Sequence, residues 1–148
     1  LKKTIGDKRF EQELILINSK DSINSIKRCH KYVAIEAENF ELLKYLKKDL
    51  VVNIASFQEM TKETIKDYFK FIYNKNEKPF YFYLCNREEK ELPDGEKIKF
   101  MNYNFKPDDL ILVDELCPWH QFFYTKYPPF LKRYDGPTRH QLRKVYNS

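Results

Sequence analysis

The chain has 148 residues, of which 42% are hydrophobic and 16% are aromatic. This length and composition predict one folded domain with a hydrophobic core, and they exclude a disordered chain, which needs low hydrophobicity. The chain has only 3 glycines and no Gly-x-Gly pattern, which excludes a glycine-rich phosphate loop. A net charge of +5 permits an acidic partner, but basic and acidic residues are interleaved, whereas a nucleic-acid binder usually gathers its basic residues on one face.

The cysteines and the lack of targeting patterns indicate an intracellular protein. Cys29, Cys85 and Cys117 are far apart, with no Cys-x-x-Cys pair, so the sequence indicates neither a disulfide framework nor a zinc site. No apolar run approaches the roughly 18 residues of a membrane span, and the chain does not open on a signal-peptide pattern. Because the first residue is Leu1, we expect the sequence to be a piece of a longer polypeptide.

The first third of the chain is predicted to hold three helices and one short strand. Residues 1–5 resemble the end of a helix that Gly6 terminates, and Leu14–Ile17 predict a strand. A basic amphipathic helix is expected from about residue 20 to 32, followed by a second helix from Glu36 to about Lys48. The apolar face of the basic helix has residues at three- and four-residue steps: Ile23, Ile26, His30 and Val33.

The remainder of the chain is predicted to mix strands and helices. Strands are expected at 50–55 and 80–85, and a hairpin from about Glu89 to Phe100 around the turn Pro93–Gly95. Helices are expected at four places, each with apolar residues at helical spacing or with helix-start residues: 61–72, 106–112, 116–127 and 138–146.

Four segments, in the same order along the chain, resemble the actin and actin-related protein family. Ser25–Glu36 is similar to the family's helix that runs from the nucleotide cleft into subdomain 4, and Glu91–Ile98 resembles its Leu-Pro-Asp-Gly hairpin. Asn102–Ile111 resembles the helix that follows this hairpin. Pro137–Asn147 is similar to the helix before the second phosphate loop of subdomain 3.

The resemblance implies an α/β fold of the actin type, with helices around a small sheet. Residues 1–115 would form a region like subdomain 4, with an insertion at about 46–86, and 116–148 would form helices that lead into subdomain 3. The family's phosphate hairpins and metal-orienting carboxylates would lie outside this chain, so we expect no catalysis by the chain alone. Its expected role is one wall of a nucleotide cleft and a surface for filament or complex assembly, with the insertion as the docking surface.

The resemblance also implies three candidate residues for nucleotide binding. One basic residue of the first helix lines the adenosine pocket of the family, and by position it is Lys27, with Asn24 one helical step away and Arg28 adjacent. A cation there can donate hydrogen bonds to the ribose or the adenine edge. The family usually has arginine where Asn24 stands and glutamate where Arg28 stands. The alternative is that Lys27 and Arg28 are the solvated side of an amphipathic helix. ATP or ADP would be a ligand of the parent protein, and we expect no cofactor or metal in this fragment.

Other candidate sites and functions have weaker support in the sequence. Cys117 and His120 provide a thiol and an imidazole but only two ligands, which is typical of a buried cysteine and a capping histidine rather than a metal site. A nucleic-acid-binding module is the alternative function, because Phe80–Tyr83 can present stacking rings and the C-terminal third is basic. In a strand those rings alternate between faces, so one set should lie in the core. We therefore expect protein partners in an actin-like filament or multisubunit complex, cytoplasmic and cytoskeletal or else nuclear, without membrane contact.

Overall fold

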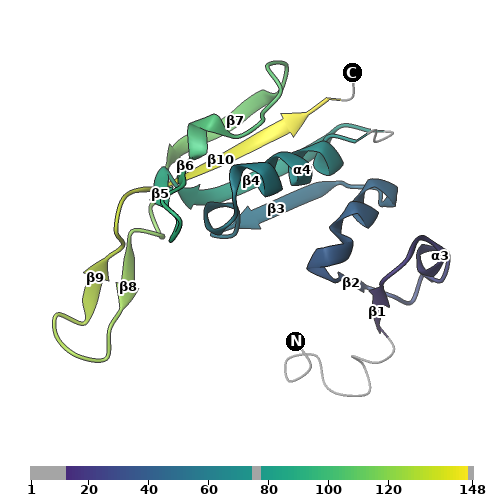
Figure 1. The fold of residues 1–148 in the computed structure, drawn as a ribbon, viewed down its shortest axis with the longest axis horizontal. Helices are drawn as coiled ribbons and strands as arrows, with labels where there is room; N and C mark the ends of the chain where they lie inside the picture. Colours follow the sequence, from purple (N-terminus) through teal and green to yellow (C-terminus); the bar gives the residue numbers. More distant parts are fainter. Residues whose placement is uncertain (1–12, 75–77, 147–148) are drawn as a thin grey trace. The chain divides into compact units, whose positions relative to one another are not determined.

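The computed structural model describes residues 13–74 and 78–146. The chain divides into two compact units, Leu1–Leu46 and Lys47–Ser148. Figure 1 shows the elements of each unit in chain order. In the described ranges, every helix is too short or too polar to cross a membrane. The predicted helix end at residues 1–5 and its cap at Gly6 lie outside the described residues.

The first unit is built on a two-stranded parallel sheet. β1 (Leu14–Ile17) pairs with β2 (Tyr32–Ile35), and Ile17 lies opposite Ile35. Between them, α3 (Lys20–Ile23) is a single turn that Ser19 caps, with the Ser19 hydroxyl accepting a hydrogen bond from the Ser22 amide at 3.3 Å. The 3₁₀ helix η1 (Ala37–Tyr45) follows β2. The predicted strand at Leu14–Ile17 is confirmed.

The predicted helix from residue 20 to 32 is wrong beyond its first turn. α3 ends at Ile23, and residues 32–35 pair with β1 instead of continuing a helix. An isolated short helix is marginal unless one face is buried, and Ile23, Ile26 and His30 are only half-buried here. The β-branched Val33 and Ile35 favour a strand once β1 is available as a neighbour. The helix expected from Glu36 is a shorter 3₁₀ segment with a kink at Asn39.

The second unit is built on a four-stranded sheet in the order β3-β4-β10-β7. β3 (Leu50–Ile54) runs parallel to β4 (Phe80–Arg87), and α4 (Lys62–Ile72) connects them. β10 (Thr138–Val145) lies antiparallel between β4 and β7 (Leu110–Leu116). Figure 1 shows α4 lying along the sheet beside β3 and β4.

The main core lies between α4 and one face of this sheet. Thr61 caps α4 by accepting a hydrogen bond from the Thr64 amide at 3.3 Å. Apolar residues at helical spacing then face the sheet, and the ring centroid of Phe69 lies 5.6 Å from that of Phe82. Fully burying one such side chain contributes about 1.5–3 kcal/mol. The residues that form this core are Phe57, Ile65, Phe69, Ile72, Phe80, Phe82, Leu84, Leu92, Ile98, Phe100, Tyr103 and Val145.

Shorter elements complete the second unit. The predicted hairpin is confirmed as β5 (Glu89–Glu91) and β6 (Lys97–Lys99), with Gly95 at a φ of 88° in its turn. β8 (Phe122–Tyr124) and β9 (Leu131–Arg133) form another antiparallel hairpin. There are also two 3₁₀ turns: η2 (Phe57–Glu59) precedes α4, and η3 (Phe100–Asn102) follows β6.

Three helices predicted for the second unit are wrong. The segment 106–112 runs into strand β7, the segment 116–127 contains strand β8, and residues 138–145 are strand β10. The region expected to hold helices of subdomain 3 is therefore built of strands in its described part. Polar residues at buried positions explain the error at β10. Gln141 and Arg143 point to the core side with Val145, so the strand lacks the apolar alternation that identifies one. The coarse prediction of a mixed helix-and-strand fold is confirmed, with strands in the majority.

Candidate functional site

The sheet of the second unit has a second face that α4 does not cover. In a strand, successive side chains point to opposite faces, and directly paired residues share a face. Leu50, Val52 and Ile54 pair with Tyr81, Tyr83 and Cys85. The core residues Phe80, Phe82 and Leu84 occupy the alternate positions of β4. Leu50, Val52 and Ile54 therefore lie on the face opposite the core, whereas Val51 packs against the core.

Much of this second face is apolar and exposed. The exposed fractions are 57% for Leu50, 52% for Val52, 52% for Ile54, 43% for Tyr81 and 48% for Leu110. We call these five residues the open patch. Half-buried Tyr83, Val113 and Leu142 belong to the same face by the strand register. Lys144 pairs with both Tyr81 and Leu110, so it separates Leu110 from the other four residues. Exposed apolar surface such as that of Leu50, Val52, Ile54 and Tyr81 marks interaction sites more often than single exposed leucines do.

The other end of the same face is closed by the segment that follows β7. His120 places its Nδ1 3.9 Å from Sγ of Cys85, and the ring of Trp119 meets that of His140 edge-on at 6.1 Å. The Tyr83 hydroxyl lies 3.2 Å from Nδ1 of His140. Cys85 and His140 are buried as a result. The open patch is therefore the part of the face that this segment leaves uncovered.

The Cys85 thiol under this segment is not an activated nucleophile. Burial, and then the neighbouring Cys117, raise the pKa of the Cys85 thiol to about 12, so Cys85 stays protonated at neutral pH and is a poor nucleophile. Cys117 is buried, as the sequence predicts. Within the described ranges, no group of three or more His, Cys, Asp or Glu side chains is placed to hold a metal ion.

β3 is also an edge strand, and among the described residues no other strand pairs with its outer side. The carbonyl of Asp49 accepts a hydrogen bond from the Tyr81 amide at 2.9 Å, and the amide of Ala55 donates one to Cys85 at 2.8 Å. Alternate residues of a strand bond to the same neighbour, so the amides and carbonyls of Leu50, Val52 and Ile54 point away from β4. Leu50–Ile54 has no proline, charged residue or bulge, which are the usual devices that block pairing at an edge.

The opposite edge, β7, has such devices. Its pairing with β10 shifts register between Leu142 and Arg143, and a bulge of this kind hinders further strand addition. Two acidic residues, Asp114 and Glu115, lie in the strand, and Asp114 pairs with Arg139 at 2.7 Å. The two edges of the sheet therefore differ, and β3 is the edge open to another strand.

The three residues predicted to bind a nucleotide lie in the first unit, in the turns after α3. Asn24 is the C-cap of α3, and the backbone amide of Lys27 donates a hydrogen bond to Nδ1 of His30 at 3.0 Å. The side chains of Asn24, Lys27 and Arg28 are exposed. Because helix α3 ends before Lys27, these residues do not share one helical face, which was the geometry that the resemblance implied.

The stacking rings of the alternative nucleic-acid reading divide between the two faces, as expected for a strand. Phe80 and Phe82 are 1% and 0% exposed in the core, whereas Tyr81 and Tyr83 lie on the other face. Sequence reasoning missed that Leu50–Ile54 is apolar on its solvent face. The signal was present, because both sets of alternate positions in this strand contain aliphatic residues.

Comparisons with protein-family models, curated proteins and solved structures found no match to this chain.

Proposed function

We propose that this chain is an assembly module that pairs with a second copy of itself through β3 and the open patch. The observation that carries the proposal is the unprotected outer edge of β3, where three exposed aliphatic side chains lie beside outward-pointing backbone groups. β-strand addition of this kind gains main-chain hydrogen bonds for affinity and side-chain contacts for specificity. The segment lies within residues 46–86, which the resemblance to the actin family implies to be a docking surface.

The register of the pairing follows from the direction of the backbone groups. In an antiparallel pair related by a two-fold axis, Val52 lies opposite Val52 of the second copy, and Leu50 lies opposite Ile54. Each outward amide then faces an outward carbonyl, and the apolar side chains meet on the same face. β-branched cross-strand pairs stabilise a sheet by about 0.2–1 kcal/mol each. The two sheets would join into one, and the open patches would become neighbours.

Charge does not oppose a second copy as the occupant. Leu50–Ile54 contains no ionisable side chain, so the two-fold pairing brings no like charges into opposition along the strand. With Val52 at the centre, Asp49 lies opposite Ala55, and Lys48 lies opposite Ser56. The net charge of +5 therefore does not concentrate at this edge, and the strand is complementary to itself.

The mass of the protein in solution tests the proposal. We expect light scattering after size exclusion to give a concentration-dependent mass that approaches twice the 18.1 kDa of one chain. Val52→Lys should give the monomer mass at all concentrations, because the edge then has a charge at its centre. Met101→Lys is the matched control, since Met101 is 69% exposed elsewhere in the same unit. A monomeric wild type, or equal dimerisation by Val52→Lys, would contradict the proposal.

For the actin-like origin, we propose that the chain is a divergent subdomain-4 region whose parent binds adenine nucleotide near Lys27. The hairpin around Pro93–Gly95 supports this proposal, because it forms where the resemblance expects it. The segments Ser25–Glu36 and Pro137–Asn147 give no such support, since they contain strands β2 and β10. A thermal-shift titration of the chain with ATP tests the ligand. A shift that Lys27→Gln abolishes is expected, and no shift would contradict it.

A further inference from the structure

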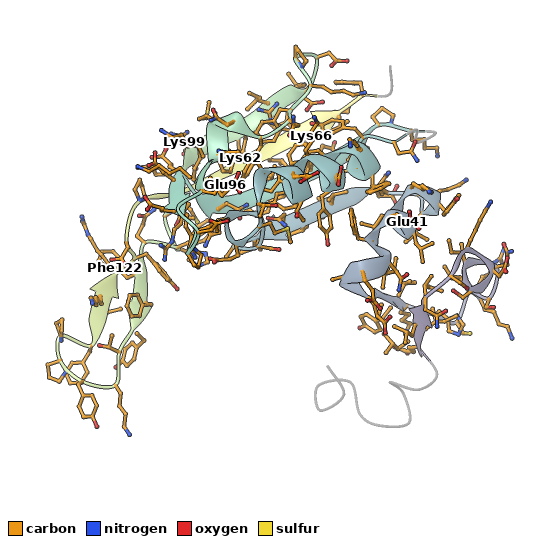
Figure 2. The ribbon with its side chains drawn as sticks, viewed as in Figure 1. Glu41, Lys62, Lys66, Glu96, Lys99 and Phe122 are labelled. Carbon is orange, nitrogen blue, oxygen red and sulfur yellow. The ribbon has the colours of Figure 1, made fainter. Side chains whose placement is uncertain are left out.

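A pocket of about 480 Å³ lies beside the first turns of α4, on a different part of the second unit from the open patch. Figure 2 labels Lys62, Lys66, Glu96 and Lys99 near that end of the helix. Ile65 and Ile98 are buried in the wall of the pocket, and Tyr103 lies beside them. Its size is that of a site for a small organic molecule. It combines apolar walls with a cationic rim.

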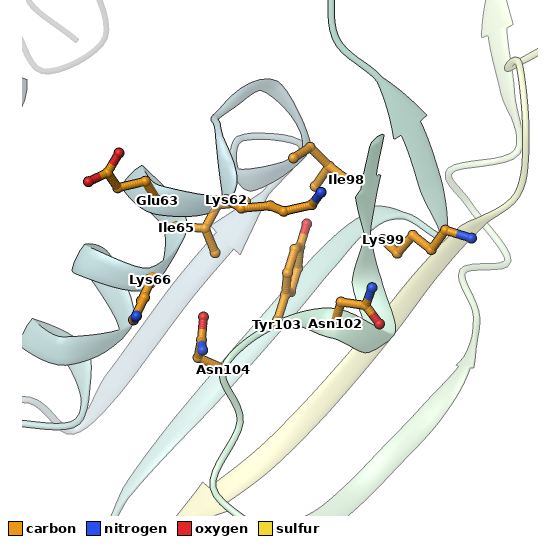
Figure 3. A pocket seen from close by; sticks show the side chains of 9 residues that line it. All are labelled: Lys62, Glu63, Ile65, Lys66, Ile98, Lys99, Asn102, Tyr103 and Asn104. Carbon is orange, nitrogen blue, oxygen red and sulfur yellow. The ribbon is translucent and has the colours of Figure 1, made fainter. Parts of the chain in front are cut away.

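Tyr103 contributes a buried polar atom without a partner. Its side chain is 7% exposed, and its ring packs against Phe100 at 5.3 Å and Phe57 at 5.8 Å. The hydroxyl has no hydrogen-bond partner among the described residues. Figure 3 shows it pointing into the pocket, toward the Lys62 side chain and Ile98. A buried hydroxyl normally finds a partner, and this one has none among the described residues.

The N-terminus of α4 already attracts a carboxylate at this place. The backbone amide of Lys62 donates a hydrogen bond to Oε2 of Glu96 at 3.4 Å, and Nζ of Lys62 lies 3.6 Å from Oε1 of the same residue. The positive end of a helix dipole favours an anion there. Both distances are long and the Lys62 side chain is 59% exposed, so water or a stronger anion can displace the carboxylate at little cost.

Three lysines surround the pocket, against a smaller acidic charge. Lys62 and Lys66 are four residues apart on α4, so they lie on the same side of the helix. Lys99 comes from β6 and pairs with Glu89 at 2.9 Å, and Figure 3 shows its amino group pointing away from the pocket. Glu63 also lines the wall. Figure 3 shows the Lys62 side chain extending toward the Tyr103 hydroxyl, whereas the Lys66 side chain extends away from it, so a ligand at Tyr103 meets Lys66 only through another rotamer of that lysine.

We infer that this pocket binds a small phosphomonoester with an aromatic or apolar body. The body would lie against Ile65, Ile98 and the Tyr103 ring, and the phosphate would meet Lys62, Lys66 and the N-terminus of α4. The Tyr103 hydroxyl would donate its hydrogen bond to a phosphate oxygen. A phosphate dianion matches two ammonium groups better than a single carboxylate does. The amides of Asn102 and Asn104, also in the wall, can bond to polar groups of the body.

Matched probes separate the parts of this inference. We would measure dissociation constants by calorimetry for phenyl phosphate, benzoate and inorganic phosphate with the full chain. Phenyl phosphate should bind with saturation and at least about tenfold more tightly than either other probe, because only it has both a dianion and an aromatic body. Benzoate binding as tightly would overturn the phosphate assignment, inorganic phosphate binding as tightly would overturn the role of the body, and no saturable binding would overturn the site.

Variants locate the binding. Lys66→Gln and Tyr103→Phe should each weaken phenyl phosphate binding by about tenfold, the usual effect of losing a hydrogen bond to a charged group. Lys70→Gln is the control, since Lys70 lies one turn further along α4 and pairs with Asp67 at 2.7 Å. Equal losses for Lys66→Gln and Lys70→Gln would overturn the site in favour of diffuse surface charge. Circular dichroism of each variant establishes that it is folded. The dimer mass is independent of this result, so the two proposals fail separately.

Discussion

Replacing Tyr103 by phenylalanine should stabilise the unliganded protein. The substitution removes one oxygen and keeps the ring contacts, including those to Phe57 and Phe100. In the folded protein the hydroxyl is buried without a partner, whereas in the unfolded chain it bonds to water. The desolvation of such a group costs about 1–3 kcal/mol. We expect the free energy of unfolding of Tyr103→Phe to rise by about 1 kcal/mol, the lower end of this range.

Urea denaturation at pH 7 measures this change directly. The pH dependence of the free energy of unfolding provides a second, independent test. Burial raises the pKa of the Tyr103 phenol above its usual value of about 10. Above pH 10 the unfolded chain therefore releases this proton while the folded protein keeps it, so wild-type stability falls as the pH rises. Tyr103→Phe lacks this loss, and its advantage should widen between pH 10 and 11.

Tyr81→Phe is the matched control for this experiment. Tyr81 is 43% exposed in the open patch, so its hydroxyl is hydrated in both states and its loss should change the free energy of unfolding by less than about 0.5 kcal/mol. A Tyr103→Phe protein that is less stable than wild type by 1 kcal/mol or more would refute the reasoning. It would mean that the Tyr103 hydroxyl has a partner within the folded chain.

Two further predictions concern buried groups of the second unit. Asp109→Asn should lower the free energy of unfolding, measured in urea, by about 3 kcal/mol, because it leaves the buried Arg143 without its counter-ion. Nη1 of Arg143 lies 3.6 Å from the Asp109 carboxylate. Asp67→Asn, in an exposed pair, should change the free energy of unfolding by less than about 1 kcal/mol, and equal effects of the two substitutions would contradict the reasoning. Iodoacetamide at pH 7.5 should alkylate one cysteine of the folded protein, the exposed Cys29, because Cys85 and Cys117 are buried. Mass spectrometry checks this, and rapid modification of Cys85 would contradict the burial described above.

The elements that the sequence predicts correctly are those with local signals. α4 follows from the Thr61 cap and from Ile65, Phe69 and Ile72 at helical spacing, and the hairpin follows from Pro93–Gly95. β10 could not be predicted, because the buried Arg143 is neutralised by Asp109, which is distant in the sequence. Its polar side chain therefore hides the alternation of a strand.

The sites depend on the same long-range contacts. The open patch combines residues of β3, β4 and β7, and it becomes visible only when the strand order is known. The pocket combines α4 with residues 98–104 across the core, so no local sequence pattern predicts it. The residues selected from the resemblance, Asn24, Lys27 and Arg28, depended on a helix longer than the one that forms.

Cross-linking at Val52 tests the central proposal, pairing through β3, most directly. In the two-fold register the two Val52 residues form a hydrogen-bonded pair with Cα atoms about 5.5 Å apart, a separation that a disulfide spans. We expect Cys29→Ser/Val52→Cys to form an intermolecular disulfide under mild oxidation, seen as a dimer band on non-reducing gels. Cys29→Ser/Met101→Cys, with an equally accessible thiol, should stay monomeric. Equal cross-linking of both variants, or none at Val52, would contradict the account.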